Sequence, residues 1–299
     1  MPLFIKTVVD SLGADRIFLL FLIYSFVGWV SEVLYVAAFV EHKFVNRGFL
    51  HGPICPIYGT GGIIILFLPV HIKQTGISLF ISSMFFCTLL EYISSWIMEK
   101  LFQAKWWDYS QMHFNLNGRV CLLNSLLFGL MGYIAMTYVQ PSFKNILFML
   151  NDTVTYYLAV SLGIIFLIDL FTTIRKLVDF NASLARLKEF SDALKERYTT
   201  ESWFRSGTIS EMLSSIKERS ATGKTSFSMT LLNKIESFNH PVKAAENIIN
   251  RFPTIRSTTY PQSLEHLRNR VHESIRERRL LLLKKRNARK NRKEHTDCN

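Results

Sequence analysis

The chain has 299 residues, 49% of them hydrophobic, and Lys and Arg outnumber Asp and Glu by 35 to 23. Residues 1–174 hold nine basic and nine acidic residues, so the whole net charge of +12 lies in the remaining part, and the chain divides into an apolar part and a basic part. The four cysteines show no CxxC spacing, which excludes the common zinc and redox motifs, and we predict no disulfide framework.

Five apolar segments approach or exceed the roughly 20 residues that an α-helix needs to cross the hydrocarbon core of a bilayer. In chain order they cover residues 17–40, 54–72, 77–98, 120–140 and 154–174. The first is too long for a signal-peptide core and is interpreted as a retained helix. The second is interrupted by three glycines and a proline, so it either spans the membrane or enters it only partly. We predict an all-α, polytopic membrane bundle of about five transmembrane helices in residues 1–174.

The distribution of Lys and Arg predicts the orientation of this bundle. A basic tail begins at Arg175 and Lys176, which favours a cytoplasmic C-terminus. With five crossings the N-terminus then lies outside. The loops predicted to be inside also hold more basic residues than those predicted to be outside.

Two of the inner loops carry similar motifs, each downstream of an acidic residue in an apolar segment. The first has Asn46-Arg47-Gly48 and Gly52-Pro53-Ile54-Cys55, the second Asn117-Gly118-Arg119-Val120-Cys121. Glu32 and Glu91 precede them, but the separations from Glu to Arg differ, so the repeat is not strict. Because an acid in hydrocarbon is costly, it usually meets a partner or a cavity, and two such acids indicate one shared polar site.

Helix pitch places three acids in the cytoplasmic half of the bilayer. Glu32, Glu91 and Asp169 lie ~12, ~10 and ~8 Å from the inner ends of their segments at 1.5 Å per residue. Each shares a helix face with small or hydroxyl residues, which membrane helices place at contacts with one another. We therefore expect these acids to point inward.

Arg47, His51 and Arg119 emerge on the same side as the acids, and an arginine can bind a carboxylate through two parallel hydrogen bonds. Two Glu–Arg pairs could simply pin the loops onto the helices. Alternatively, they could form a polar cavity, open to the cytoplasm, for an ion, a lipid headgroup or another polar solute. The candidate residues of this site are Glu32, Asn46, Arg47, His51, Tyr58, Glu91, Asp108, Asn117, Arg119, Asn124 and Asp169. We expect no metal or cofactor, and we interpret the aromatic residues of Trp106-Trp107-Asp108-Tyr109-Ser110 as anchors at the membrane interface.

The tail is predicted to have a helical region, residues 175–275, and a polybasic end, residues 276–299. Apolar residues from Leu177 to Tyr198 recur at heptad spacing, broken at Ser191, which predicts a helix that forms a coiled coil or packs on the rest of the tail. The polybasic end could bind anionic lipid. Equally, it could remain solvated without a ligand. Nucleic acid is a polyanion that it would also suit, but this alternative is less favoured. Its basic residues are Lys284, Lys285, Arg286, Arg289, Lys290, Arg292 and Lys293.

Several motifs resemble those of a known family. The block Asn46–Pro53 with Pro56-Ile57-Tyr58-Gly59, then Trp107–Ser110 and Asn117-Gly118-Arg119, resembles the bacterial CmpB-like family of ABC-transporter permeases, which is similar to animal proteins of the TMEM229 type. The resemblance covers about residues 17–175. It implies a multi-pass protein of the bacterial cytoplasmic membrane that works with a separate ATPase subunit. Five helices are few for a translocation path, which favours a homodimer or another subunit.

The leading hypothesis is therefore a permease-type transport component among membrane lipids. A membrane-embedded enzyme acting on a lipid-linked substrate is the alternative, with Glu32, Glu91 or Asp169 as general acid or base. The sequence offers no nucleophile, metal cluster or histidine dyad for it. A non-catalytic scaffold that recruits partners through the basic tail is the third possibility.

Overall fold

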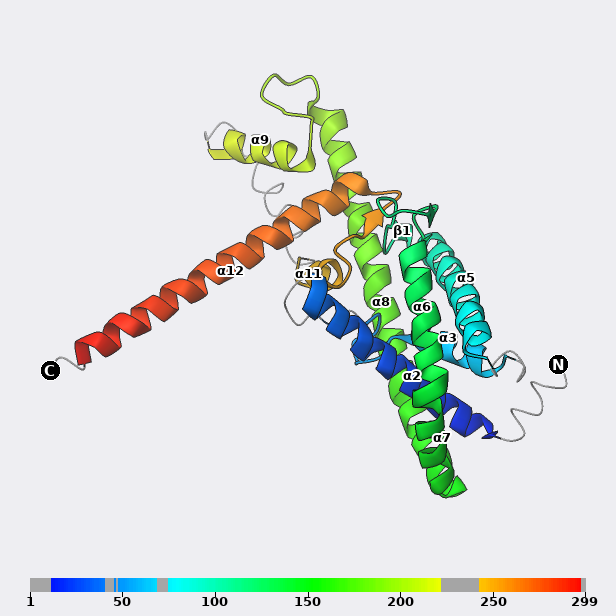
Figure 1. Ribbon diagram of the computed structural model, residues 1–299. Helices are drawn as coiled ribbons and strands as arrows, with labels where there is room; N and C mark the ends of the chain where they lie inside the picture. Colours follow the sequence, from blue (N-terminus) through cyan, green and yellow to red (C-terminus); the bar gives the residue numbers. More distant parts are fainter. Residues whose placement is uncertain (1–11, 41–45, 47, 69–74, 222–241, 297–299) are drawn as a thin grey trace. The chain divides into compact units, whose positions relative to one another are not determined.

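The structure, a computed structural model, describes residues 12–40, 46, 48–68, 75–221 and 242–296 (Figure 1). These residues belong to two compact units. The first, the membrane unit, comprises residues 1–178 and 251–256, and the second, the tail unit, comprises residues 179–250 and 257–299.

Four helical stretches in the described part of the chain are long and apolar enough to cross a membrane. The first is α2 (Ala14–Tyr35), which continues into the π-helix η1 (Val36–Val40), and the second is α5 (Gly76–Phe102). The third is built from α6 (Leu122–Ile134), the π-helix η2 (Ala135–Val139) and α7 (Gln140–Met149). The fourth is α8 (Asp152–Tyr198), whose residues from Asp179 onward belong to the tail unit. The chain is a multi-pass membrane protein.

The second predicted crossing is only partly helical. Its helix, α3 (Pro56–Leu66), has 11 residues, so its rise of about 16 Å covers roughly half of the hydrocarbon thickness. A fifth spanning helix is therefore not confirmed. The glycines that interrupt this segment do not break α3, because they are used for close packing against its neighbours.

Glycines allow α2 and α3 to approach closely. A Cβ atom on Gly28 of α2 would lie 2.2 Å from Cγ of Tyr58, and one on Gly62 of α3 would lie 2.4 Å from Cδ2 of Tyr24. The contact between α5 and α6 is of the same kind, since a Cβ on Gly132 would lie 2.4 Å from the Ser83 side chain. Small residues at helix contacts are typical of membrane bundles.

Short strands order the segment between α5 and α6. β2 (Asn115–Leu116) pairs antiparallel with β3 (Val120–Cys121), and β1 (Ala104–Lys105) pairs with β4 (Arg256–Ser257). Residues 251–256 thus contribute to the membrane unit although they lie far away in the sequence.

The tail unit is helical, with α9 (Ile209–Ala221), most of α11 (Val242–Arg251) and α12 (Pro261–Thr296) joining the end of α8. The predicted apolar seam of α8 is buried, and Ser191 within it donates a hydrogen bond to Sδ of Met212 in α9 (3.7 Å). This favours the second alternative for α8, packing on the rest of the tail. The side chains of the predicted polybasic end, residues 284–293, lie outside the described residues.

Candidate functional site

The described residues between η1 and α3, 46 and 48–55, are non-helical, and side chains satisfy several of their backbone groups. Oδ1 of Asn46 accepts hydrogen bonds from Nε1 of Trp29 (2.8 Å) and from the amide of Gly48 (2.9 Å). Arg251 donates to the carbonyl oxygen of Leu50 (2.8 Å). Buried backbone groups outside a helix need such partners, so this loop is a fixed structure. Arg47, a predicted site residue, lies outside the described residues.

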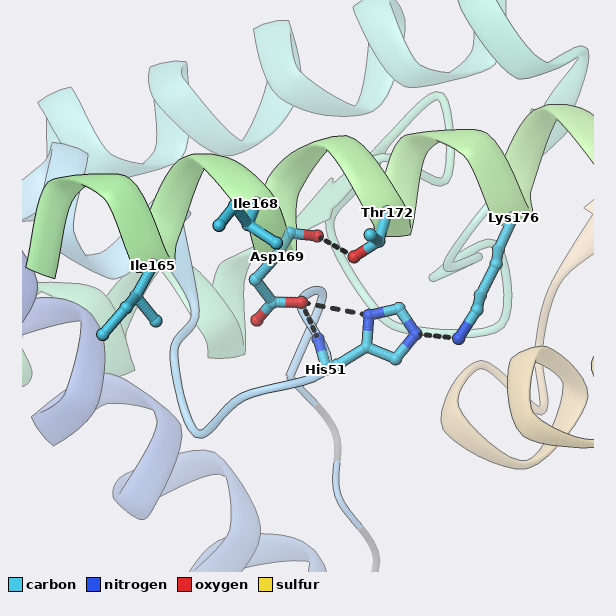
Figure 2. Close-up of a pocket in the computed structure, with 6 residues that line it drawn as sticks. All are labelled: His51, Ile165, Ile168, Asp169, Thr172 and Lys176. Atoms are coloured by element: carbon cyan, nitrogen blue, oxygen red, sulfur yellow. Dashed lines mark hydrogen bonds and ion pairs between the residues drawn. The ribbon is translucent and has the colours of Figure 1, made fainter.

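Asp169 of α8 binds the middle of the same loop. Its carboxylate accepts hydrogen bonds from the amides of His51 (3.0 Å) and Gly52 (2.8 Å), and Nδ1 of His51 lies 3.0 Å from its Oδ1. On the other side of the ring, Nζ of Lys176 lies 2.7 Å from Nε2 of His51 (Figure 2). A lysine ammonium can only donate, so Nε2 accepts and Nδ1 carries the proton toward Asp169 and Thr173. The structure thus joins two predicted site residues, His51 and Asp169.

Glu32 and Glu91 each accept a hydrogen bond from a tyrosine that follows in the sequence. The hydroxyl of Tyr58 donates to Oε2 of Glu32 (2.6 Å), and that of Tyr109 donates to Oε1 of Glu91 (3.3 Å). Glu91 is 5% exposed, whereas the other three residues are half-buried. We call these four residues the glutamate–tyrosine cluster.

The electrostatics of the loop residues show that the two halves of the cluster are close. Burial raises the pKa of Tyr109 far above its usual value, and the nearby carboxylates of both Glu91 and Glu32 raise it further. Burial, followed by Glu32, raises the pKa of the Cys55 thiol to about 12. Tyr109 therefore interacts electrostatically with both acids.

Arg119 has a partner that the sequence did not predict. It forms an ion pair with Glu99 (2.6 Å), not with Glu91, and it also donates to the hydroxyl of Ser95 (3.5 Å). Glu99 lies two helical turns beyond Glu91 on α5, nearer to the loop that carries Arg119. The predicted pair between Glu91 and Arg119 is therefore wrong.

The other predicted residues between α5 and α6 mainly shape the loop. Asp108 accepts hydrogen bonds from the amide (3.0 Å) and hydroxyl of Ser110 and pairs with Arg256 (2.8 Å). The hydrogen bond from the Ser110 hydroxyl is the main reason that the pKa of Asp108 is lowered. Asn117 adopts a left-handed φ of 55° and donates to the hydroxyl of Tyr92 (3.0 Å). Asn124 is half-buried in the first turn of α6.

We predicted that the aromatic residues of this loop act as anchors at the membrane interface. Two of them instead make contacts inside the membrane unit. Trp106 is 3% exposed and packs edge-to-face on Phe102 (5.8 Å) and Phe252 (4.9 Å). Tyr109, in the same stretch, belongs to the cluster. The sequence analysis did not predict four residues that contact the predicted site residues or their loops, namely Glu99, Tyr109, Lys176 and Arg251. Tyr109 had a usable signal, because it follows Glu91 in the second motif much as Tyr58 follows Glu32 in the first.

In the part of the chain that the structure describes, no three His, Cys, Asp or Glu side chains are placed to hold a metal ion. The glutamate–tyrosine cluster contains two carboxylates and two phenol hydroxyls. Such groups accept hydrogen bonds or a positive charge.

A family model described as "Putative ABC-transporter type IV" matches residues 19–174. The chain belongs to this family. The match covers both motif loops and all three intramembrane acids, and it confirms the resemblance noted from the sequence. No curated protein and no solved structure matches the chain.

Proposed function

We propose that the chain is the permease component of an ABC-type transporter in a bacterial cytoplasmic membrane. In this proposal the glutamate–tyrosine cluster is a cytoplasm-facing polar site on the path of a polar solute. A separate ATPase subunit supplies the energy, and a second copy or another membrane subunit completes the path.

The observation that carries the proposal is the pairing of each intramembrane glutamate with a tyrosine. Tyr58 and Tyr109 are neutral donors, so these contacts with Glu32 and Glu91 are hydrogen bonds and not ion pairs. The second buried oxygen of Glu91, Oε2, has no hydrogen-bond partner among the described residues. Acidic residues within membrane segments commonly mark substrate and ion pathways.

The interrupted second crossing supports the same proposal. The half-length α3 follows a loop whose backbone is held by Asp169 and Arg251. Irregular backbone at membrane depth is tolerated where it is buried in protein or lines a cavity, and transporters build solute sites at such discontinuous helices.

The enzyme alternative has less support in the described residues. The buried acids contact tyrosines there. Ser210 is hydrogen-bonded to His266 (3.0 Å), a contact of the kind that hydrolytic catalysis uses, but both residues belong to the tail unit, whereas the acids belong to the membrane unit. The scaffold alternative depends on the basic tail, and the side chains of its polybasic end lie outside the described residues.

Transport can be tested in inside-out membrane vesicles from the native host that contain the wild-type chain, no chain, Glu91→Gln or Glu189→Gln. The vesicles are energised with ATP in a cytosolic extract, and the accumulated solutes are measured by mass spectrometry. Glu189 is exposed on the tail part of α8 and provides the same substitution outside the cluster.

We expect at least one solute to accumulate only with the wild-type or Glu189→Gln chain. Glu91→Gln should lower its accumulation about tenfold, because a hydrogen bond to a carboxylate is worth about 1–1.5 kcal/mol more than one to a neutral amide. If no solute depends on the chain, or if Glu91→Gln accumulates it normally, the proposal is wrong.

A further inference from the structure

A second candidate site lies on α8, where polar and apolar side chains lie next to each other. His51, Ile165, Ile168, Asp169, Thr172 and Lys176 line an open pocket of about 560 Å³ (Figure 2). None of these residues belongs to the glutamate–tyrosine cluster.

The apolar part of this pocket faces the lipid. Ile165 and Ile168 are 61% and 59% exposed on a helix that is apolar enough to span a membrane. Exposed isoleucines at this depth contact acyl chains. One wall of the pocket is therefore already suited to hydrocarbon.

The polar part lies about one to two turns further along α8. Thr172 and Lys176 are exposed, and Lys176 comes two residues after the end of the predicted crossing at Ile174. Lysines at this position reach toward the headgroup region. An amphiphile lying along α8 would thus place its chain on the isoleucines and its headgroup beside Lys176.

The charges of the pocket favour an anionic headgroup. Asp169 is occupied, because it accepts hydrogen bonds from the amides of His51 and Gly52 and from the His51 ring. Arg251 of α11, which donates to the Leu50 carbonyl of this loop (2.8 Å), carries a second positive charge near Asp169. Lys176 donates to the neutral His51 ring (2.7 Å), a weaker partner than a phosphate, so its ammonium can turn to an incoming anion.

From these observations we infer that this pocket, the α8 lipid site, binds a phospholipid with a net negative charge. The phosphate contacts Lys176 and Thr172, and an acyl chain lies against Ile165 and Ile168. This site is independent of the proposed transport site and of the polybasic end.

The inference can be tested on the wild-type full-length chain by chemical labelling of lysines. The protein is reconstituted in vesicles of phosphatidylcholine alone or of phosphatidylcholine with phosphatidylglycerol. Acetylation rates at Lys176 and Lys100 are then measured by peptide mass spectrometry. Lys100, exposed in the last turn of α5, controls for the general effect of a negative membrane surface.

We expect phosphatidylglycerol to slow acetylation of Lys176 about fivefold more than that of Lys100, which corresponds to the interaction of one basic residue with anionic lipid. Phosphatidylcholine alone should leave the two rates similar. Equal protection of both lysines by phosphatidylglycerol would overturn the inference.

Two further arms distinguish the lipid from its headgroup. Glycerol 3-phosphate added to phosphatidylcholine vesicles should not protect Lys176; full protection would show that the ligand is a soluble phosphate ester. Ile168→Ser should weaken protection by phosphatidylglycerol, because it removes an apolar contact at an exposed position. Unchanged protection in this variant would refute the acyl-chain contact.

Discussion

The close packing of α2 on α3 makes Gly28 a sensitive position, and Gly28→Ala tests whether this packing holds the glutamate–tyrosine cluster. A Cβ atom there would lie 2.2 Å from Cγ and 2.3 Å from Cβ of Tyr58, whereas ordinary contacts begin at 3.4 Å. Tyr58 would therefore have to move by about 1.2 Å. Its 2.6 Å hydrogen bond to Glu32 cannot survive such a shift.

The expected loss of stability combines three contributions. Overpacking costs about 1–3 kcal/mol, and the lost hydrogen bond of a buried polar group costs about 1–3 kcal/mol. Replacing glycine by alanine in a helix returns about 1 kcal/mol. We expect Gly28→Ala to lower the free energy of unfolding by about 1–5 kcal/mol.

Gly163→Ala is the matched control, because its Cβ would lie 3.6 Å from Cε1 of Phe18, an ordinary contact. It should be neutral or stabilising by up to about 1 kcal/mol. Unfolding in mild detergent titrated with sodium dodecyl sulfate, followed by circular dichroism, measures both variants. Combining Gly28→Ala with Tyr58→Ala should remove most of the effect of Gly28→Ala, because the clash is then absent. If Gly28→Ala is as stable as Gly163→Ala, the packing argument is refuted.

Two further predictions concern the loop between α5 and α6. Tyr109→Phe removes the hydroxyl that donates to buried Glu91, so it should lower the midpoint of detergent unfolding by an amount equivalent to about 1–3 kcal/mol. The control is Tyr157→Phe, at a side chain that is 67% exposed, which should have no effect. Equal midpoints for the two variants would contradict the hydrogen bond between Tyr109 and Glu91. The pKa of Asp108 is lowered in the folded state, so its stabilising contribution is complete above its unfolded pKa of about 3.9 and is lost as the pH falls through the lower folded pKa. In the wild type, limited proteolysis by pepsin should cut this loop increasingly as the pH falls from 5 to 2. In Asp108→Asn the loop should be cut more readily at pH 5, and the rate of cutting should change less with pH. Parallel pH profiles for the two proteins would refute this role of Asp108.

The sequence was sufficient to predict the helical membrane bundle, because the length and composition of apolar segments depend only on local residues. It also predicted the inward direction of Glu91, since Ser83, Ser95 and Glu91 are all buried on one face of α5. The extent of α3 was not predictable in the same way. Where a helix gives way to an irregular loop depends on distant side chains that satisfy the loop, such as Asp169 and Arg251.

The partners of the acids were the least predictable part of the site. Arg119 was assigned to Glu91 by charge, yet it reaches Glu99, which lies closer to the loop. Tyr109 was set aside as an interfacial aromatic residue. Its fold back toward α5 depends on turn geometry, including the left-handed residues Asn117 and Gly118, and propensity alone does not fix such a path.

Tyrosine partners give Glu32 and Glu91 a different chemistry from the predicted arginine partners. A buried pair of glutamate and arginine is neutral overall, and separating it leaves two uncompensated charges at a cost of about 3–5 kcal/mol. A glutamate held by a tyrosine needs only one neutral donor to be displaced, so a cation or hydrogen-bond donor can replace it at lower cost. Glu32 and Glu91 have the same partner type although the separations from Glu to Tyr are 26 and 18 residues. The two loops therefore reach the same chemistry by different paths, which is expected if the chemistry of the pair, and not the loop, is what the site requires.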